Sequence, residues 1–171
     1  MNKLPFQTRL DILHMLCEDS SMRAISRVKD VAFNSVKKLL IDAGTVCAAF
    51  HDATIRNLTV TKIQCDEIWA FCYAKAKTVP YAKKPVEGAG DVWTWTAIDA
   101  DTKLIVSWLV GNRDGDTAAV FIRDLKTRLA NRVQLTTDGH KAYLQAVEDA
   151  FGADIDYAML IKLYGASDDP E

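Results

Sequence analysis

The chain has 171 residues, of which 49 % are hydrophobic and 26 % are charged, so it has enough apolar residues to bury a core. Its formal net charge of −2 argues against a strongly basic nucleic-acid-binding protein, although residues 1–60 have eight Lys and Arg against six Asp and Glu. No apolar run is long enough to span a membrane, and the charged N-terminus is unlike a signal peptide. We therefore expect no membrane partner and a cytoplasmic location.

The first sixty residues are predicted to form three short helices. Leucines at three-to-four spacing predict the first helix over residues 5–17. Either Ser20 or Ser21 is a suitable N-cap for the second helix. The third helix is predicted over residues 33–43, with Gly44 ending it.

Three helices with a break near Asp30 suggest a helix-turn-helix DNA-binding domain over residues 1–60, in which the second helix supports the third in the major groove. The polar residues on the outward faces of the second and third helices are the candidate DNA contacts, either to base edges or to phosphates. These candidates are Arg23, Arg27, Asn34, Ser35, Lys37 and Lys38. The alternative is a small helical cap with a solvated polar face, since the glycine usual in such a turn is missing.

From residue 61 the pattern changes to strands alternating with helices. Strands are predicted over residues 61–71, 92–99, 104–110, 132–138 and 154–164, and helices over residues 117–129 and 140–151. This order, β-β-β-α-β-α-β, predicts an α/β fold whose sheet begins antiparallel and ends parallel. It matches a ribonuclease-H-like mixed sheet with flanking helices, which we predict for residues 61–171.

Two aspartates occupy related places in this order of elements. Asp66 lies in the middle of the first strand, where its apolar neighbours predict burial, and Asp138 follows the fourth strand. In a ribonuclease-H-like sheet these two places are adjacent, and neighbouring carboxylates repel one another unless a cation lies between them. Mg²⁺ and Mn²⁺ are oxygen-seeking ions suited to such a pair, and two metal ions can promote phosphoryl transfer. We therefore predict Asp66 and Asp138 as metal ligands and catalytic residues.

The residues beside these aspartates have alternative interpretations. Asp138 and Gly139 could form an ordinary turn. Glu67 points to the other face of its strand from Asp66 and is predicted to be a structural or solvated acid. His140 and Lys141 are candidates for contact with a DNA phosphate, although His140 could simply begin the following helix.

Four lysines lie between the first two strands, in a stretch with two prolines and two glycines: Lys75, Lys77, Lys83 and Lys84. One interpretation is that they contact DNA beside the metal site. The other is a solvated hairpin loop.

Four stretches, IQCDEIWAF, GAGDVWTWTAIDADTKLIVSWLVG, LANRVQLTTDGHKAYL and DYAMLIKLYG, resemble the DDE-type transposases of bacterial insertion sequences, in particular the insertion-sequence-one class. The resemblance covers residues 4–165. It implies a helix-turn-helix that holds the terminal inverted repeats of an element, and a ribonuclease-H-like domain that uses divalent metal to cut DNA and join it to a target. It also implies a homo-oligomer on double-stranded DNA, associated with the bacterial nucleoid, in which Asp66 and Asp138 are the first two catalytic acids.

The sequence departs from the family at its third acid, a glutamate on a later helix, because the acids after Asp138 lie in a different context. The catalytic domain is therefore expected to be incomplete and to hold one metal ion poorly, so activity of the chain alone is doubtful. One alternative is a non-enzymatic DNA-binding remnant that occupies element ends. Another is a ribonuclease-H-like nuclease, against which the missing acid also counts.

Overall fold

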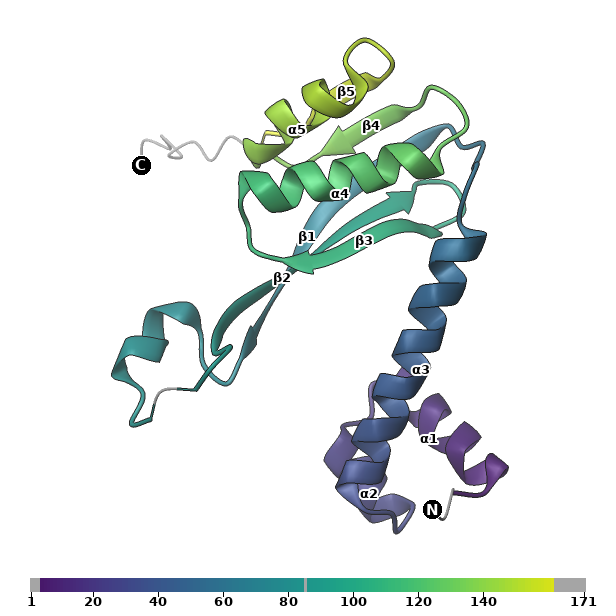
Figure 1. The fold of residues 1–171 in the computed structure, drawn as a ribbon, viewed down its shortest axis with the longest axis vertical. Coiled ribbons are helices and arrows are strands. Elements are labelled where there is room, and N and C mark those ends of the chain that lie inside the picture. Colours follow the sequence, from purple (N-terminus) through teal and green to yellow (C-terminus); the bar gives the residue numbers. More distant parts are fainter. Residues whose placement is uncertain (1–3, 85, 162–171) are drawn as a thin grey trace, which may run out of the picture. The chain divides into compact units, whose positions relative to one another are not determined.

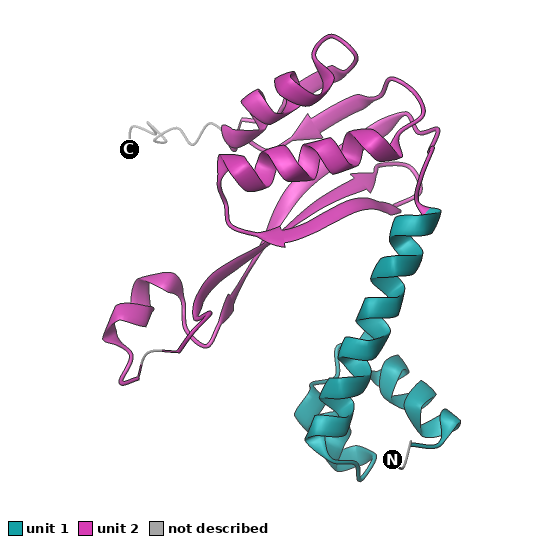
Figure 2. Cartoon of the chain, viewed as in Figure 1, with its two compact units in different colours: residues 1–54 teal, residues 55–171 magenta. Residues whose placement is uncertain are grey.

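The computed structural model describes residues 4–84 and 86–161, and the chain divides into two units, residues 1–54 and 55–171 (Figure 2). The sequence had suggested a boundary at residue 60. Residues 55–60 belong instead to the second unit, because Leu58 forms a β-bridge with Leu129. The backbone N–H of Leu58 donates to the carbonyl oxygen of Arg128, and that of Ala130 donates to the carbonyl oxygen of Leu58.

The first unit consists of three helices, as predicted. They are α1 (Phe6–Cys17), α2 (Met22–Val28) and α3 (Phe33–Thr54). Each helix contributes one fully buried residue to a small core, namely Ile12, Ile25 and Val36. The hydroxyl of Ser21 accepts a hydrogen bond from the backbone N–H of Ala24, so Ser21 is the N-cap of α2.

The predicted end of the third helix at Gly44 is wrong, because α3 continues to Thr54. A glycine in a helix interior costs only about 1 kcal/mol relative to alanine, and no proline follows it before residue 54. The hydroxyl of Thr45 also donates to the carbonyl oxygen of Ile41, so the threonine after the glycine fits within the helix.

The second unit has a five-stranded mixed sheet in the order β3-β2-β1-β4-β5 (Figure 1). Its strands are β1 (Lys62–Cys72), β2 (Gly90–Asp99), β3 (Ile105–Gly111), β4 (Gln134–Thr137) and β5 (Asp156–Met159). The pairs β1–β2 and β2–β3 are antiparallel, whereas β1–β4 and β4–β5 are parallel. The predicted α/β class and order of elements are therefore confirmed. Residues 162–164 of the last predicted strand lie outside the described residues.

Two helices, α4 (Gly115–Arg128) and α5 (Ala142–Phe151), pack against each other and against one face of this sheet (Figure 1). Leu129, which the pattern placed on the same apolar stripe as four residues of α4, follows the end of the helix and is only partly buried. The rest of the stripe, Ala118, Phe121, Ile122 and Leu125, is fully buried, as its three-to-four spacing predicted. It shares one core with Trp95 of β2 and Tyr143 of α5.

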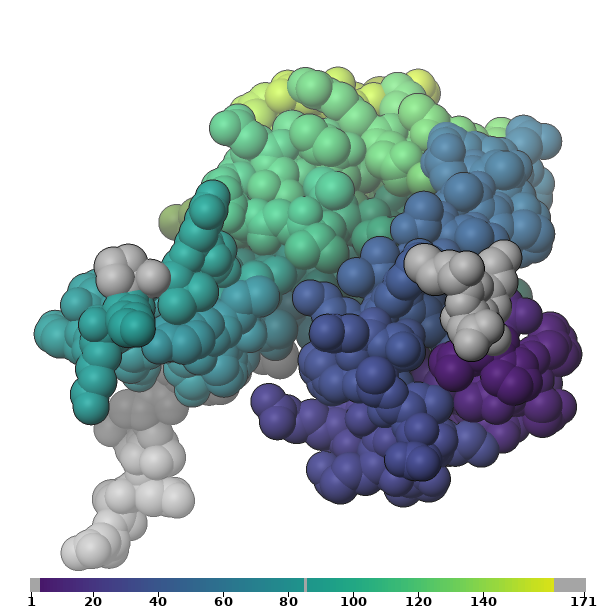
Figure 3. Space-filling view, turned by 60° about the horizontal axis from the view of Figure 1, so that its bottom comes forward, coloured from purple at the N-terminus to yellow at the C-terminus, as the bar shows by residue number. Residues whose placement is uncertain are grey.

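The strands β1 and β2 extend beyond the rest of the sheet. Strand β4 pairs only with residues 62–65 of β1, and β3 pairs only with residues 93–98 of β2. Beyond these points the two strands form a two-stranded ribbon that ends in a short 3₁₀ helix, η1 (Ala76–Tyr81). Figure 3 shows this teal segment standing clear of the green body of the second unit.

In the described ranges of the chain, none of the helices combines the length and apolar character needed to cross a membrane.

Candidate functional site

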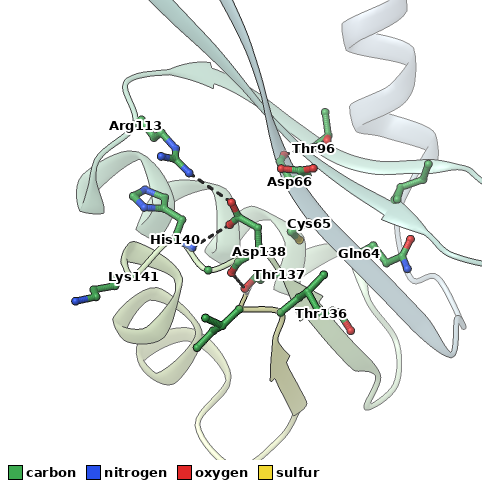
Figure 4. A pocket seen from close by; sticks show the side chains of 14 residues that line it. Gln64, Cys65, Asp66, Thr96, Arg113, Thr136, Thr137, Asp138, His140 and Lys141 are labelled. Atoms are coloured by element: carbon green, nitrogen blue, oxygen red, sulfur yellow. Dashed lines mark hydrogen bonds and ion pairs between the residues drawn. The ribbon is translucent and has the colours of Figure 1, made fainter. Parts of the chain in front are cut away.

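The parallel pairing of β1 with β4 brings Asp66 and Asp138 to the same place on the sheet. The last paired residues of the two strands are Cys65 and Thr137; Asp66 is the next residue of β1, and Asp138 is the first residue after β4. Both aspartates line one cavity of about 930 Å³ (Figure 4). Two residues 72 positions apart in the sequence thus share one cavity because of the strand order.

Asp66 is exposed, whereas its apolar neighbours had predicted burial. The reason is the alternation of side chains along β1. Ile63 and Cys65 point into the core beneath α4 and α5, and Asp66 lies on the opposite face. One carboxylate oxygen of Asp66 accepts a hydrogen bond of 2.8 Å from the backbone N–H of Glu67.

Asp138 has a structural role as well as a place in the cavity. Its Oδ1 accepts a hydrogen bond of 3.0 Å from the backbone N–H of His140, so it closes the turn that follows β4. Its Oδ2 lies 3.4 Å from Nη2 of Arg113, and the side chain is 38 % exposed (Figure 4). Asp138 can therefore close the turn with one carboxylate oxygen while its side chain remains accessible from the cavity.

Glu67 and Arg113 form an ion pair beside this cavity that the sequence analysis missed. The Glu67 side chain is only 1 % exposed, and its Oε2 lies 2.9 Å from Nε of Arg113. The Arg113 guanidinium also stacks on the ring of Trp93, with 4.9 Å between Cζ and the ring centroid. Arg113 thus connects a buried carboxylate with the exposed carboxylate of Asp138.

The backbone around Arg113 is fixed on both sides. The indole Nε1 of Trp95 donates a hydrogen bond of 3.0 Å to the carbonyl oxygen of Asn112. Asp114 is the N-cap of α4 and accepts from the backbone N–H of Thr117. In sequence, the only signal was an arginine between a strand end and an N-cap, while its partner Glu67 lies 46 positions away.

The ring of His140 faces the protein interior. Its centroid lies 5.7 Å from that of Trp95 and 6.1 Å from that of Tyr143. Three buried polar atoms in this region lack a hydrogen-bond partner among the described residues, namely Nε2 of His140, the hydroxyl of Tyr143 and Oε1 of Glu67. Burial raises the pKa of the Tyr143 hydroxyl. Of the predicted phosphate contacts, Lys141 is exposed and its side chain extends away from Asp138 in Figure 4.

The residues predicted to contact DNA lie on α2 and on the first turns of α3. Arg23, Arg27, Asn34, Lys37 and Lys38 are exposed, and Ser35 is half-buried. Asp30 adopts a positive φ of 49° in the turn between the two helices, which is the left-handed conformation for which glycine is usual. Two of the cations have partners within the unit. Arg23 lies over the ring of Phe33, and Lys38 forms an ion pair of 2.5 Å with Asp42.

No protein-family model matches this sequence, and no curated protein matches it significantly. The chemistry of the site must therefore be inferred from its own residues.

The donor atoms of the cavity fit a hard divalent cation in kind but are few in number. Asp66 and Asp138 offer carboxylate oxygens, the ligands that Mg²⁺ and Mn²⁺ prefer. Among residues 4–84 and 86–161, no group of three or more His, Cys, Asp or Glu side chains is arranged to hold a metal ion. A pair of carboxylates is nevertheless a common protein contribution to magnesium sites, where water and substrate phosphate supply the other ligands.

Proposed function

We propose that this protein is a DNA-binding phosphoryl-transfer enzyme of the DDE-transposase type, in which Asp66 and Asp138 hold Mg²⁺ or Mn²⁺. The main support is that the two aspartates line one cavity, at the point where the parallel pairing of β1 with β4 ends. Ligand sites of open α/β sheets lie beyond the carboxyl ends of their parallel strands, and Asp138 lies at that end of β4.

The strand order gives independent support for a ribonuclease-H-like fold. Three antiparallel strands followed by two parallel strands, in the order β3-β2-β1-β4-β5, are what the proposal requires. The first acid then lies on the central strand β1, and the second acid follows its parallel neighbour β4. The same order makes these two acids neighbours without any long loop.

In the proposed reaction, the oxygen of water or of a DNA 3′ hydroxyl would attack a DNA phosphate as the opposite P–O bond breaks and its oxygen leaves, and a bound divalent metal would supply stabilisation of the negative charge. The carboxylates of Asp66 and Asp138 would hold the cation, and Asp138 would be kept in orientation by the backbone N–H of His140. Arg113 lines the same cavity and is 37 % exposed, so its guanidinium could contact a DNA phosphate there.

The first unit would act as a helix-turn-helix domain that holds double-stranded DNA at element ends, with the protein as a homo-oligomer. The exposed Asn34 and Lys37 near the start of α3 are the candidates for base and phosphate contact. A second candidate function is DNA binding without catalysis. It is favoured by the small number of metal ligands, since no third acid joins the two aspartates in the described part of the chain.

The metal site can be tested without measuring DNA cleavage. Metal that binds only the folded protein should stabilise it by ~1.4 kcal/mol at about ten times its Kd. For a chain of this size that corresponds to a rise in melting temperature of about 4 °C. Asp66→Asn and Asp138→Asn should each abolish the rise with Mn²⁺, because each removes one of the two charged ligands.

The control for this measurement is Glu148→Gln, which removes an exposed carboxylate from α5 outside the cavity and should keep the full rise. Calorimetric titration should detect this Mn²⁺ site in the wild type and in Glu148→Gln, but not in the two aspartate variants. An equal response of wild type and all three variants to metal would reject the metal site. DNA binding with no metal response would favour the non-enzymatic function.

The DNA-binding role of the first unit predicts a difference between two kinds of variant. Lys37→Ala should weaken binding of the full chain to all duplex sequences, because a phosphate contact is lost, and should make the salt dependence shallower. Asn34→Ala should mainly reduce the preference for one sequence. Fluorescence anisotropy at several salt concentrations measures both effects. Lys62→Ala, which removes an exposed lysine of β1, is the control. Affinities unaffected by Lys37→Ala and Asn34→Ala would show that this face is a solvated surface.

A further inference from the structure

The β1–β2 ribbon and its connection, residues 68–93, have no role in the function proposed above. We call this segment the arm. Beyond Cys65, β1 pairs with β2 alone, and within the arm only Trp93 also pairs with β3, so the ribbon lies outside the five-stranded part of the sheet from Val92 outward. None of the described residues of the arm is fully buried, although Trp93 packs against the core of the second unit, and the arm contains several large aromatic side chains.

One face of the arm has a row of aromatic rings. Trp69 pairs directly with Trp93 across the ribbon, and paired residues of neighbouring strands share a face. Phe71 lies two residues further along β1, with its ring centroid 5.7 Å from that of Trp69. Trp69 is 40 % exposed and Phe71 is also exposed. Exposed aromatic rings that lie together on one face are more typical of binding sites than single exposed apolar residues are.

Cations lie over two of these rings. The Lys75 ammonium is 4.9 Å from the ring centroid of Trp69, and the Arg113 guanidinium is 4.9 Å from that of Trp93. Arg113 contacts Trp93 and also Asp138, so the row of rings begins beside the cavity and continues outward along the ribbon, on the face of β1 opposite to Asp66.

The arm is positively charged in an acidic protein. It has four lysines, all of them exposed, and two acids, Glu87 and Asp91, giving +2 in a chain with a net charge of −2. The lysines are Lys75, Lys77, Lys83 and Lys84. One acid has a structural role, since Asp91 accepts a hydrogen bond from the backbone N–H of Ala76. The charge therefore favours an anionic partner.

We propose that the arm binds single-stranded DNA, with unpaired bases stacked on Trp69 and Phe71 and phosphates held by the lysines. Proteins that bind single strands combine these two features, a positive surface and exposed aromatic rings. Duplex DNA would use the lysines but not the rings, because its bases are already stacked on one another. A role for the arm in DNA cleavage would rest on the proposed function, whereas binding of single-stranded DNA by the arm requires neither metal nor the two aspartates.

Two tryptophans offer a matched pair of variants. Trp69 is on the arm and is 40 % exposed, whereas Trp108 is on β3 outside the arm and is 44 % exposed. A stacked base contributes about 1–3 kcal/mol, so Trp69→Ala should weaken binding of a labelled 20-nucleotide oligothymidine about tenfold or more. Trp108→Ala should leave the affinity unchanged, and Trp69→Phe should retain most of it. The full chain is used, with anisotropy as the readout.

The lysines and the duplex provide two further comparisons. Replacing all four arm lysines with alanine should weaken oligothymidine binding and make its salt dependence shallower, because fewer counterions are released. Trp69→Ala should leave the affinity for a duplex of equal length unchanged. Asp66→Asn and Asp138→Asn should bind oligothymidine as well as the wild type does, so a missing metal response would reject the proposed function without rejecting the arm.

Each other outcome contradicts the proposal. Equal oligothymidine affinities of Trp69→Ala, Trp108→Ala and wild type would exclude stacking on the arm. An equal loss of single-strand and duplex affinity in Trp69→Ala would indicate a general effect on DNA binding. If Trp69→Ala left the oligothymidine affinity unchanged but altered the sedimentation coefficient of the protein, the arm would instead contact a second copy of the chain.

Discussion

Replacing Asp124 with alanine is expected to lower the free energy of unfolding by about 3 kcal/mol, because it removes the carboxylate that pairs with the buried guanidinium of Arg128. The Arg128 guanidinium donates two hydrogen bonds to this aspartate, at 2.6 Å from Nε to Oδ2 and 3.0 Å from Nη2 to Oδ1, and its Nη1 also donates to the carbonyl oxygen of Ile55. The Arg128 side chain is only 7 % exposed. Asp124 also accepts a 2.5 Å hydrogen bond from the buried hydroxyl of Ser107, which ties α4 to β3.

Urea unfolding measures this effect, with Asp149→Ala as the control. Asp149 is an exposed acid of α5, and its loss should cost less than about 0.5 kcal/mol. The double variant Asp124→Ala, Arg128→Met should recover part of the lost stability, since a buried ion pair can be replaced by apolar side chains at low cost. If the double variant were as unstable as Asp124→Ala, the buried charge of Arg128 could not be the cause.

The same ion pair predicts that the free energy of unfolding depends on pH. Burial alone would raise the pKa of Asp124, but hydrogen bonds from Arg128 and Ser107 outweigh it, so the pKa is lowered. A carboxyl group whose pKa is lower in the folded state stabilises the fold above its unfolded pKa of about 3.9. This contribution is lost as the pH falls through the folded pKa. Asp124→Asn should therefore lose less stability than wild type between about pH 5 and pH 2.

Periodicity was sufficient to predict most elements of the second unit. The spacing of Phe121, Ile122 and Leu125 correctly indicated the buried face of α4, because a helix that packs on a sheet must place its apolar residues on one side. The same reasoning failed for Gly44, where the pattern contained a helix-breaking residue that the surrounding helix tolerates.

The environment of the candidate site was harder to predict than its location. The order of strands brings Asp66 and Asp138 to one cavity, and this was predicted by matching the order of elements along the chain to a ribonuclease-H-like sheet. The exposure of Asp66 depends on which face of the sheet the helices cover, and local neighbours do not contain that information. The pairing of Glu67 with Arg113 depends on the path of the chain after β3, so no pattern within either segment could reveal it.

Replacing Arg113 with alanine is expected to destabilise the protein by about 2 kcal/mol. The cost arises at Glu67, whose side chain is 1 % exposed and would lose its cation. One oxygen of Glu67 already lacks a hydrogen-bond partner among the described residues, so that carboxylate has little to compensate for the loss. The estimate lies below that for a fully buried pair because Arg113 is itself 37 % exposed.

A double-mutant cycle with Glu67→Gln tests whether the buried charge is the cause. A neutral amide needs no cation, so Glu67→Gln in the Arg113→Ala background should restore more than half of the lost stability, whereas alone it should destabilise. Arg123→Ala, which removes an exposed arginine of α4, should change the free energy of unfolding by less than about 0.5 kcal/mol. Additive effects of the two substitutions in chemical unfolding would mean that Glu67 and Arg113 are not coupled.

The rise in melting temperature with Mn²⁺ should persist in the double variant, since Asp66 and Asp138 are both retained. Its loss there would instead assign Arg113 a direct part in positioning Asp138, which it contacts at 3.4 Å.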